Sequence, residues 1–71
     1  MNQNVRIKSV KYKQVEATIH NINQGDLVLD TKDNCYGYID MKSANTVAIR
    51  HGCIVELAIP INRVRKLIEI D

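Results

Sequence analysis

The sequence of this 71-residue chain predicts an all-β fold. Apolar and polar residues alternate along several short segments, which is the period-2 pattern of half-buried strands. Turn-forming residues separate these segments at intervals of roughly 8–12 residues, as in small barrels. No segment carries a convincing helical stripe of apolar residues. We therefore expect one domain over residues 1–71, folded as a small barrel of about five to six short antiparallel strands.

The N-terminal part is expected to contain one or two of these strands. Residues 1–4 are polar and are expected to fray. Residues 5–8 alternate as a strand, and the alternation slips in phase at Ser9, which indicates a bulge or a turn. A second alternating run covers residues 15–19. This run either pairs with residues 5–8 as a hairpin or prolongs the first strand after a bend.

The middle of the chain is expected to form two strands, each preceded by a turn. Residues 21–26 are rich in turn formers, and Gly25 supplies the left-handed backbone freedom that a tight turn needs. Residues 27–30 are apolar without clean alternation, so both faces of this strand are covered or it contains a bulge. After a Lys-Asp-Asn turn, residues 35–40 form the next strand. Gly37 at its centre marks a close backbone approach or a sharp bend.

The strongest strand signal is a hairpin over residues 46–59, which turns at His51-Gly52. Its alternation predicts that Ala48 and Glu56 are among the residues that point outward. The side chains expected to point inward are Val47, Ile49, Val55, Leu57 and Ile59. These inward residues should supply most of the core of so small a protein.

The end of the chain is expected to contain a short turn and a last strand. Pro60 cannot donate to a strand ladder, so it ends the hairpin or lies at an edge. Residues 61–63 have the right length for a single 3₁₀ turn, and residues 64–70 form the closing strand. The alternative is a helix over residues 61–70. The apolar residues that fit a helical stripe there are Ile61, Val64, Leu67 and Ile68.

The predicted elements together resemble the SH3-like small-barrel superfamily, in its Tudor- and KOW-type branch. The resemblance covers residues 24–68. It rests on Gly25-Asp26-Leu27-Val28 at a strand start, Tyr36-Gly37-Tyr38-Ile39 in the following strand, the hairpin from Val47 to Ile59, and Pro60, Arg63, Val64 and Leu67 at the end. The resemblance implies a binding module without catalysis. Members of this superfamily bind nucleic acid, bind proline-rich or methylated peptides, or dock within larger complexes.

The chain departs from the pattern of this superfamily in two respects. It has three tyrosines but no tryptophan and no phenylalanine. The aromatic cage of methyl-lysine readers and the groove for proline-rich ligands both need several converging aromatic residues. The segment 5–20 also lies outside the common core. The resemblance therefore supports the fold more strongly than any one ligand.

Composition and charge narrow the class of protein. The net charge is +2 with a pI near 8.7, which is too mildly basic to imply nucleic acid by itself. No window reaches the ~20 apolar residues of a membrane span, and the N-terminal MNQNVRIK lacks the apolar core of a secretory signal. We expect a cytoplasmic protein without membrane contact. Cys35 and Cys53 are expected to be reduced and partly buried.

No residue pattern indicates catalysis or a metal site. Ser9 and Ser43 lie outside any Gly-x-Ser-x-Gly context, and neither histidine has a carboxylate at a diagnostic spacing. The chemically acceptable zinc ligands are His20, Cys35, His51 and Cys53, but His51-Gly52-Cys53 is not a recognised ligand spacing. We therefore expect no enzyme activity, no cofactor, no metal and no small-molecule substrate.

Basic residues at the two ends of the chain are the clearest functional signal. The candidate nucleic-acid-binding residues are Arg6, Lys8, Lys11, Tyr12, Lys13, Arg63, Arg65 and Lys66. A basic surface beside an aromatic side chain combines phosphate contacts with base stacking, as in proteins that bind single strands. The competing interpretation is a solvated basic edge that prevents aggregation between strands. The slightly favoured function is contact with nucleic acid or a ribonucleoprotein through these strands.

The alternative function is docking on another protein. Tyr36 and Tyr38 point away from Ile39, and with Ile54 and Ala58 they could form an apolar interface. The partner would be a larger complex or a second copy of the chain. A small regulator or subunit, such as a phage-encoded one, would fit this alternative.

Overall fold

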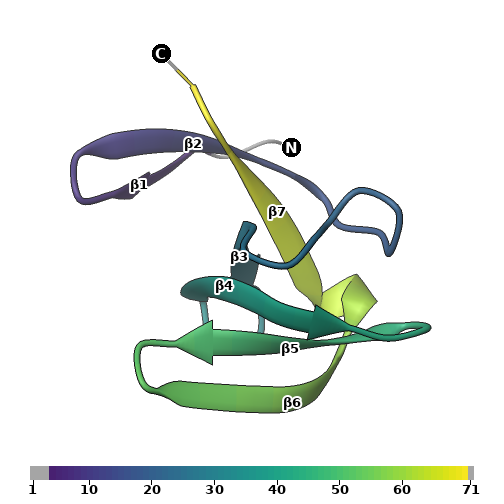
Figure 1. Cartoon of the computed structure of the whole chain (residues 1–71). Helices are drawn as coiled ribbons and strands as arrows, with labels where there is room; N and C mark the ends of the chain where they lie inside the picture. The colour runs from purple at the N-terminus through teal and green to yellow at the C-terminus, as the bar shows by residue number, and fades with distance from the viewer. Residues whose placement is uncertain (1–3, 71) are drawn as a thin grey trace.

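The computed structural model describes residues 4–70 and shows a single antiparallel sheet of seven strands in the order β1-β2-β7-β3-β4-β5-β6 (Figure 1). The strands are β1 (Val5–Ile7), β2 (Val10–Glu16), β3 (Leu27–Asp30), β4 (Cys35–Lys42), β5 (Thr46–His51), β6 (Ile54–Pro60) and β7 (Val64–Glu69), with a 3₁₀ turn, η1 (Ile61–Arg63), before the last. No α-helix occurs in the described residues. The all-β prediction is confirmed, but the predicted strand count of five to six is wrong. The sheet is not closed, because β1 and β6 are its two edges.

The extra strand comes from the N-terminal hairpin. β1 pairs with β2 in a register that places Val5 opposite Tyr12. Lys8 and Ser9 both have positive φ values, 50° and 71°, as a two-residue hairpin turn requires. The phase slip at Ser9 is therefore a turn. The second strand is Val10–Glu16 rather than the predicted run over 15–19, and the prediction for residues 1–4 falls almost wholly outside the described residues.

The core lies inside the bent half of the sheet that β3, β4, β5, β6 and β7 form. The fully buried side chains at its centre are Ile22, Val28, Ile39, Val47, Ile49, Ile59 and Val64. β3 is covered on both faces, since its residues 28, 29 and 30 are all buried. This explains why the sequence of β3 shows no alternation.

β7 joins the two parts of the molecule. It pairs with β2 on one side and with β3 on the other (Figure 1). The predicted 3₁₀ turn at residues 61–63 and the closing strand are confirmed, and the helix alternative over residues 61–70 is wrong. The Cα of Tyr12 faces Glu69, and that of Val28 faces Lys66. The N-terminal hairpin is thus held beside the core by one continuous strand.

Two β-bulges change which side chains point inward. The register shifts once between β4 and β5, where Ile39 faces Ile49 but Met41 faces Ala48. It shifts again between β5 and β6, where Val47 faces Ile59 but Ile49 faces Glu56. The second bulge contains Ala58, whose φ is 59°. An extra residue reverses the alternation on one side of a bulge, which no period-2 pattern can show.

The prediction for β6 is therefore wrong at Val55, Glu56 and Leu57, since Val55 faces Arg50 rather than a core residue. Leu57 was expected inside but is 68% exposed, whereas Glu56 shares a face with the buried Ile49. Ala48, expected outside, is 2% exposed. The predicted strand 35–40 also extends two residues further, to Lys42. Its end is held by Lys42 Nζ, which donates to the carbonyl oxygens of Ile19 and Ile22 at 2.7 and 2.8 Å.

Because of the bulge, the larger of two apolar truncations in β6 should cost less free energy of unfolding than the smaller one. Leu57→Ala removes three carbons from an exposed side chain and should change the free energy of unfolding by less than about 0.5 kcal/mol. Ile59→Val removes one carbon from a fully buried side chain and should cost about 1 kcal/mol. Urea unfolding followed by circular dichroism measures both values. A larger loss for Leu57→Ala would show that Leu57 is in the core.

Candidate functional site

The N-terminal hairpin carries the positive charge of the protein. Residues 5–13 contain four of the ten basic residues and none of the eight acidic ones, so this segment has a charge of +4 and the rest of the chain −2. The basic residues are Arg6, Lys8, Lys11 and Lys13. Among the described residues, none of these side chains forms an ion pair. All are exposed, so their charges are available to a ligand.

The register decides how these charges are arranged. Arg6 lies opposite Lys11, so both project from one face of the hairpin, together with Lys13 two residues on. Tyr12 projects from the other face. Lys8 occupies the turn between the two strands. The hairpin therefore has a basic face, an aromatic face and one lysine at its tip.

The basic residues of the C-terminal segment do not join this surface. Arg63 donates to both carboxylate oxygens of Asp30, through Nε at 2.8 Å and Nη2 at 2.7 Å. Lys66 donates to the carbonyl oxygen of Asn21 and lies 3.7 Å from a carboxylate oxygen of Asp26. The predicted basic face that combines both ends of the chain is therefore not formed, because Arg63 and Lys66 hold the fold together.

Arg65 occupies a third position, on the aromatic side of the sheet. It lies opposite Glu16 on β2 and opposite Leu29 on β3. Its acidic neighbour in the register offsets part of its charge. Of the predicted nucleic-acid-binding residues, only those of the N-terminal hairpin form one continuous positively charged element.

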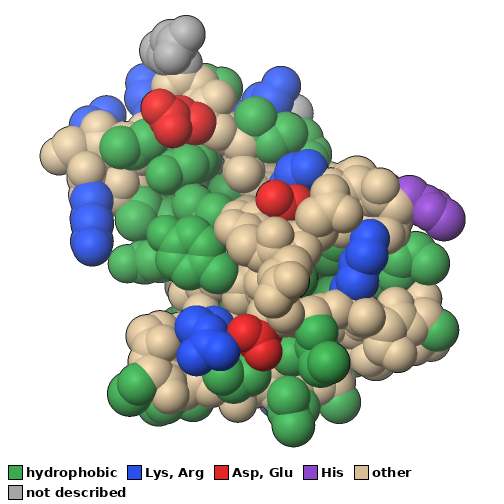
Figure 2. Space-filling view, in the orientation of Figure 1, with side chains coloured by type: hydrophobic (Ala, Val, Ile, Leu, Met, Phe, Trp, Pro, Cys, Tyr) green, Lys and Arg blue, Asp and Glu red, His purple; other side chains and the backbone are tan. Residues whose placement is uncertain are grey.

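A groove of about 350 Å³ lies between this hairpin and the core, and all three tyrosines of the chain line it. Its lining consists of Ile7, Lys8, Val10, Tyr12, Leu27, Tyr36, Tyr38 and Gly52. Tyr36 and Tyr38 are 42% and 50% exposed, so a large part of each side chain is open to a ligand. Figure 2 shows hydrophobic side chains gathered in a hollow on this face, with lysine and arginine side chains around its margin.

The strand order brings the tyrosines together. Tyr38 lies opposite Leu27 and Tyr36 opposite Leu29, so both rings share the β3 face that continues through β7 to Tyr12. From the sequence we expected Tyr12 at a nucleic-acid site and Tyr36 and Tyr38 at a protein interface. These residues line one groove. No local signal predicts this, because it depends on β7 lying between β2 and β3.

The predicted protein interface is divided. Tyr36 and Tyr38 lie on the groove, whereas Ile54 faces His51 on the other face of the sheet. Ile54 lines a second pocket of about 500 Å³, and Tyr36 lines this pocket as well as the groove. Ala58 lies in the bulge of β6 beside the exposed Leu57. The residue that the register places on the tyrosine side is Val55, opposite Arg50.

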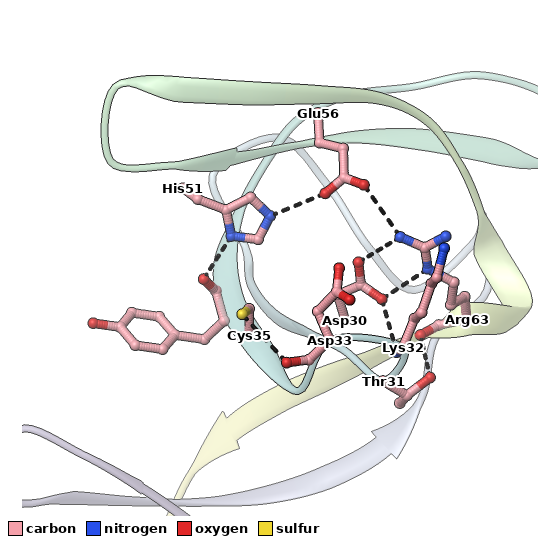
Figure 3. A network of polar contacts seen from close by, with 9 residues as sticks. Asp30, Thr31, Lys32, Asp33, Cys35, His51, Glu56 and Arg63 are labelled. Atoms are coloured by element: carbon pink, nitrogen blue, oxygen red, sulfur yellow. Dashed lines mark hydrogen bonds and ion pairs between the residues drawn. The ribbon is translucent and has the colours of Figure 1, made fainter.

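A network of polar side chains lies at the same end of the core (Figure 3). Asp30 is 1% exposed and pairs with Arg63, which also donates to Glu56 Oε2 at 3.3 Å. His51 Nδ1 donates to the carbonyl oxygen of Tyr36 at 2.9 Å, and its Nε2 lies 3.6 Å from Glu56 Oε1. The sequence does not predict this network, because Glu56 joins it only through the bulge in β6, which no local pattern indicates.

The centre of this network is the ion pair between Asp30 and Arg63, and Glu56 is a second acidic partner of Arg63. Hydrogen bonds from Arg63 hold the pKa of Asp30 below its ordinary value, despite burial that acts in the opposite direction. The same contacts raise the pKa of Arg63. One carboxylate oxygen each of Asp30, Asp33 and Glu56 lie within 4.8 Å of one another, a spacing that could hold a cation. Arg63 already donates to both oxygens of Asp30 and to Glu56, so its single positive charge offsets part of the charge of the three carboxylates.

The cysteines differ from the prediction. Cys35 and Cys53 are both free and exposed, rather than partly buried. Cys35 Sγ donates to the carbonyl oxygen of Asp33 at 3.4 Å, in the turn before β4. Cys53 follows Gly52 in the β5–β6 turn, and both cysteines lie at strand ends where the core does not reach.

Over residues 4–70, no helix has the length and apolar character that a membrane crossing requires. Comparisons with protein-family models, with curated proteins and with solved structures found no match to this chain.

Proposed function

We propose that this chain is a non-enzymatic module that binds nucleic acid through its N-terminal β1–β2 hairpin. The observation that carries the proposal is the group of four exposed basic side chains on the hairpin, none of which has an acidic partner among the described residues. Phosphate groups release counterions when such side chains neutralise them, which supplies most of the free energy of nonspecific binding.

The contrast with the other basic residues supports this proposal. Arg50, Arg63 and Lys66 each have an acidic partner within 4.0 Å, and Lys42 donates to two carbonyl oxygens. These side chains stabilise the fold. The hairpin side chains contribute nothing comparable to the fold, and like charges at Arg6 and Lys11 lie directly opposite each other. Such a pair is unfavourable in the free protein and is relieved by a bound anion.

The resemblance to SH3-like small barrels is compatible with this function. The bent antiparallel sheet and the 3₁₀ turn before the last strand support that part of the proposal. The N-terminal hairpin is an addition outside the resembling segment, and it is the part that we assign to nucleic acid. A cytoplasmic location is part of the same proposal.

We expect the combined substitution of Arg6, Lys8, Lys11 and Lys13 by Gln to weaken binding of a labelled oligonucleotide at least tenfold at low salt. The plot of log affinity against log salt concentration should become shallower by about 3, because each phosphate contact contributes roughly 0.7–0.9 to its slope. Fluorescence anisotropy titrations at several salt concentrations measure both quantities. The circular dichroism spectrum should stay unchanged, since these side chains are exposed.

Two single variants provide a matched control. Lys11→Gln and Lys32→Gln each remove one exposed lysine that has no acidic partner within residues 4–70, and of the two only Lys11 lies on the hairpin. Lys11→Gln should weaken binding, whereas Lys32→Gln should leave it within about twofold. Equal effects of the two variants would show that binding depends on the net charge of the protein and not on the position of the lysine. Unchanged binding by the fourfold variant would exclude the hairpin as the binding element and favour the edge-protection role of its lysines.

The alternative of a protein-docking module receives less support. The four residues assigned to it do not form one patch, because Ile54 and Ala58 lie away from the tyrosine groove. The groove itself could accept a peptide.

A further inference from the structure

We infer that the tyrosine groove holds unpaired bases, so that the ligand of this protein is single-stranded nucleic acid. The inference rests on the function proposed above and names the class of ligand. The groove is the hollow of about 350 Å³ lined by Tyr12, Tyr36 and Tyr38 together with apolar side chains of β1, β2 and β3. Its volume lies in the range of small-molecule sites, roughly 300–1,000 Å³, which suits one or two bases.

Two aromatic side chains of the groove are exposed to solvent. Tyr36 and Tyr38 follow each other on one face of β4 and remain about half exposed, although Leu27 and Leu29 lie directly opposite them. Aromatic rings on the face of a sheet are stacking platforms for bases, and stacking tolerates any base because each has a π face. The buried cluster that contains Ile39 and Ile49 lies on the other face of β4, so the exposed parts of Tyr36 and Tyr38 are available to a ligand.

The positive charge near the groove is complementary to the phosphates of a nucleic acid. Lys8 at the tip of the hairpin lines the groove, so a phosphate beside a bound base would meet an ammonium group. Arg6, Lys11 and Lys13 project from the opposite face of the same two-stranded hairpin. One sheet thickness separates them from the groove, which is close to the ~10 Å screening length at 0.1 M salt. Lys8 therefore contacts the part of the strand in the groove, and nucleotides that continue past the edge strand β1 contact the basic face.

Only a single strand can use the tyrosine groove. In a duplex each base is stacked on both faces by its neighbours, so the tyrosine rings have no free π face to contact. A duplex could bind the basic hairpin through its phosphates, but the groove would add nothing. Preference for single strands is therefore the property that distinguishes the groove from the hairpin.

The sequence provides a direct probe of the groove. The chain has no tryptophan, and its three tyrosines all line the groove, so the intrinsic fluorescence of the protein reports on that site, with Tyr36 also lining the pocket that contains Ile54. We expect a twelve-residue oligothymidylate to quench this fluorescence and its duplex with oligoadenylate to bind at least tenfold more weakly. Heparin, a polyanion without bases, should bind the hairpin and leave the tyrosine fluorescence nearly unchanged.

Variants of one tyrosine separate stacking from folding. Tyr38→Leu should weaken oligothymidylate binding about tenfold and leave heparin binding unchanged within twofold. Tyr38→Phe keeps the ring and should bind as the parent protein does. Ile54→Ala, an exposed apolar side chain outside the groove, is the matched control and should have no effect.

The outcomes distinguish failure of this inference from failure of the proposed function. If duplex and single strand bind equally and Tyr38→Leu changes neither affinity, the groove does not hold bases, although salt-sensitive binding through the hairpin stands. If neither oligothymidylate nor heparin binds at low salt, the proposed function fails as well. Tyrosine quenching by an unrelated peptide but not by oligothymidylate would assign the groove to a protein partner and overturn the inference.

Discussion

Replacement of Asp30 by Asn should lower the free energy of unfolding by about 2–3 kcal/mol, although it changes a single atom. The Asp30 side chain is 1% exposed, and Arg63 donates to both of its oxygens. Loss of one partner of a buried ion pair typically costs about 3–5 kcal/mol, because the other charge stays buried. We expect a smaller cost here, since the Arg63 side chain is 22% exposed and keeps its contact with Glu56.

The exposed ion pair between Asp40 and Arg50 is the matched control. Its side chains are 32% and 49% exposed, with a nitrogen to oxygen distance of 2.8 Å that resembles the buried pair. Asp40→Asn should therefore cost less than about 1 kcal/mol. Urea unfolding followed by far-ultraviolet circular dichroism compares the two variants. Similar losses for both would show that burial of Asp30 does not strengthen its pair.

The pH dependence of stability should identify the same carboxylate. The pKa of Asp30 in the folded protein lies below its ordinary value of 3.8 because of the hydrogen bonds from Arg63. The contribution of Asp30 to stability is therefore complete above that ordinary value and is lost as the pH falls through the folded pKa. The parent protein should lose stability in acid more steeply than Asp30→Asn. Identical acid profiles would exclude Asp30 as the group responsible.

Gly37→Ala should lower the free energy of unfolding by about 3 kcal/mol, at the upper end of the cost of overpacking. A Cβ atom at this position would lie 2.6 Å from the carbonyl oxygen of Arg50, 2.6 Å from Cγ2 of Ile49 and 2.9 Å from Nδ1 of His51. The carbonyl belongs to the backbone of β5, so relief requires β4 and β5 to separate. The close backbone approach expected for this glycine is thus confirmed.

Gly52→Ala is the control for this substitution. Nothing lies within 4 Å of a Cβ at Gly52, whose φ of +65° imposes only the conformational cost of a left-handed residue, about 1 kcal/mol. Chemical denaturation of both variants gives the comparison. If Gly37→Ala costs no more than Gly52→Ala, the strands accommodate a methyl group and the contact is not a constraint. Retention of the His51 contact with the Tyr36 carbonyl can be followed through the His51 imidazole resonances.

The sequence by itself determined the local elements. Alternation and turn residues identified the first strand, the turn before β3, the hairpin around Gly52 and the 3₁₀ turn at residues 61–63. These features depend on neighbours a few residues apart, so the chain encodes them locally. The apolar segment without alternation limited β3 to two possibilities, a bulge or two covered faces, and the structure shows the second.

The tertiary structure decided the site. The bulge at Ala58 exposes Leu57 and turns Glu56 toward Arg63, and a pattern of period 2 contains no sign of one inserted residue. The position of β7 between β2 and β3 places Tyr12 and Tyr38 in one groove while Arg63 is held by Asp30. Both results depend on pairing between segments far apart in the chain, and such pairing is set by packing and register rather than by local preference.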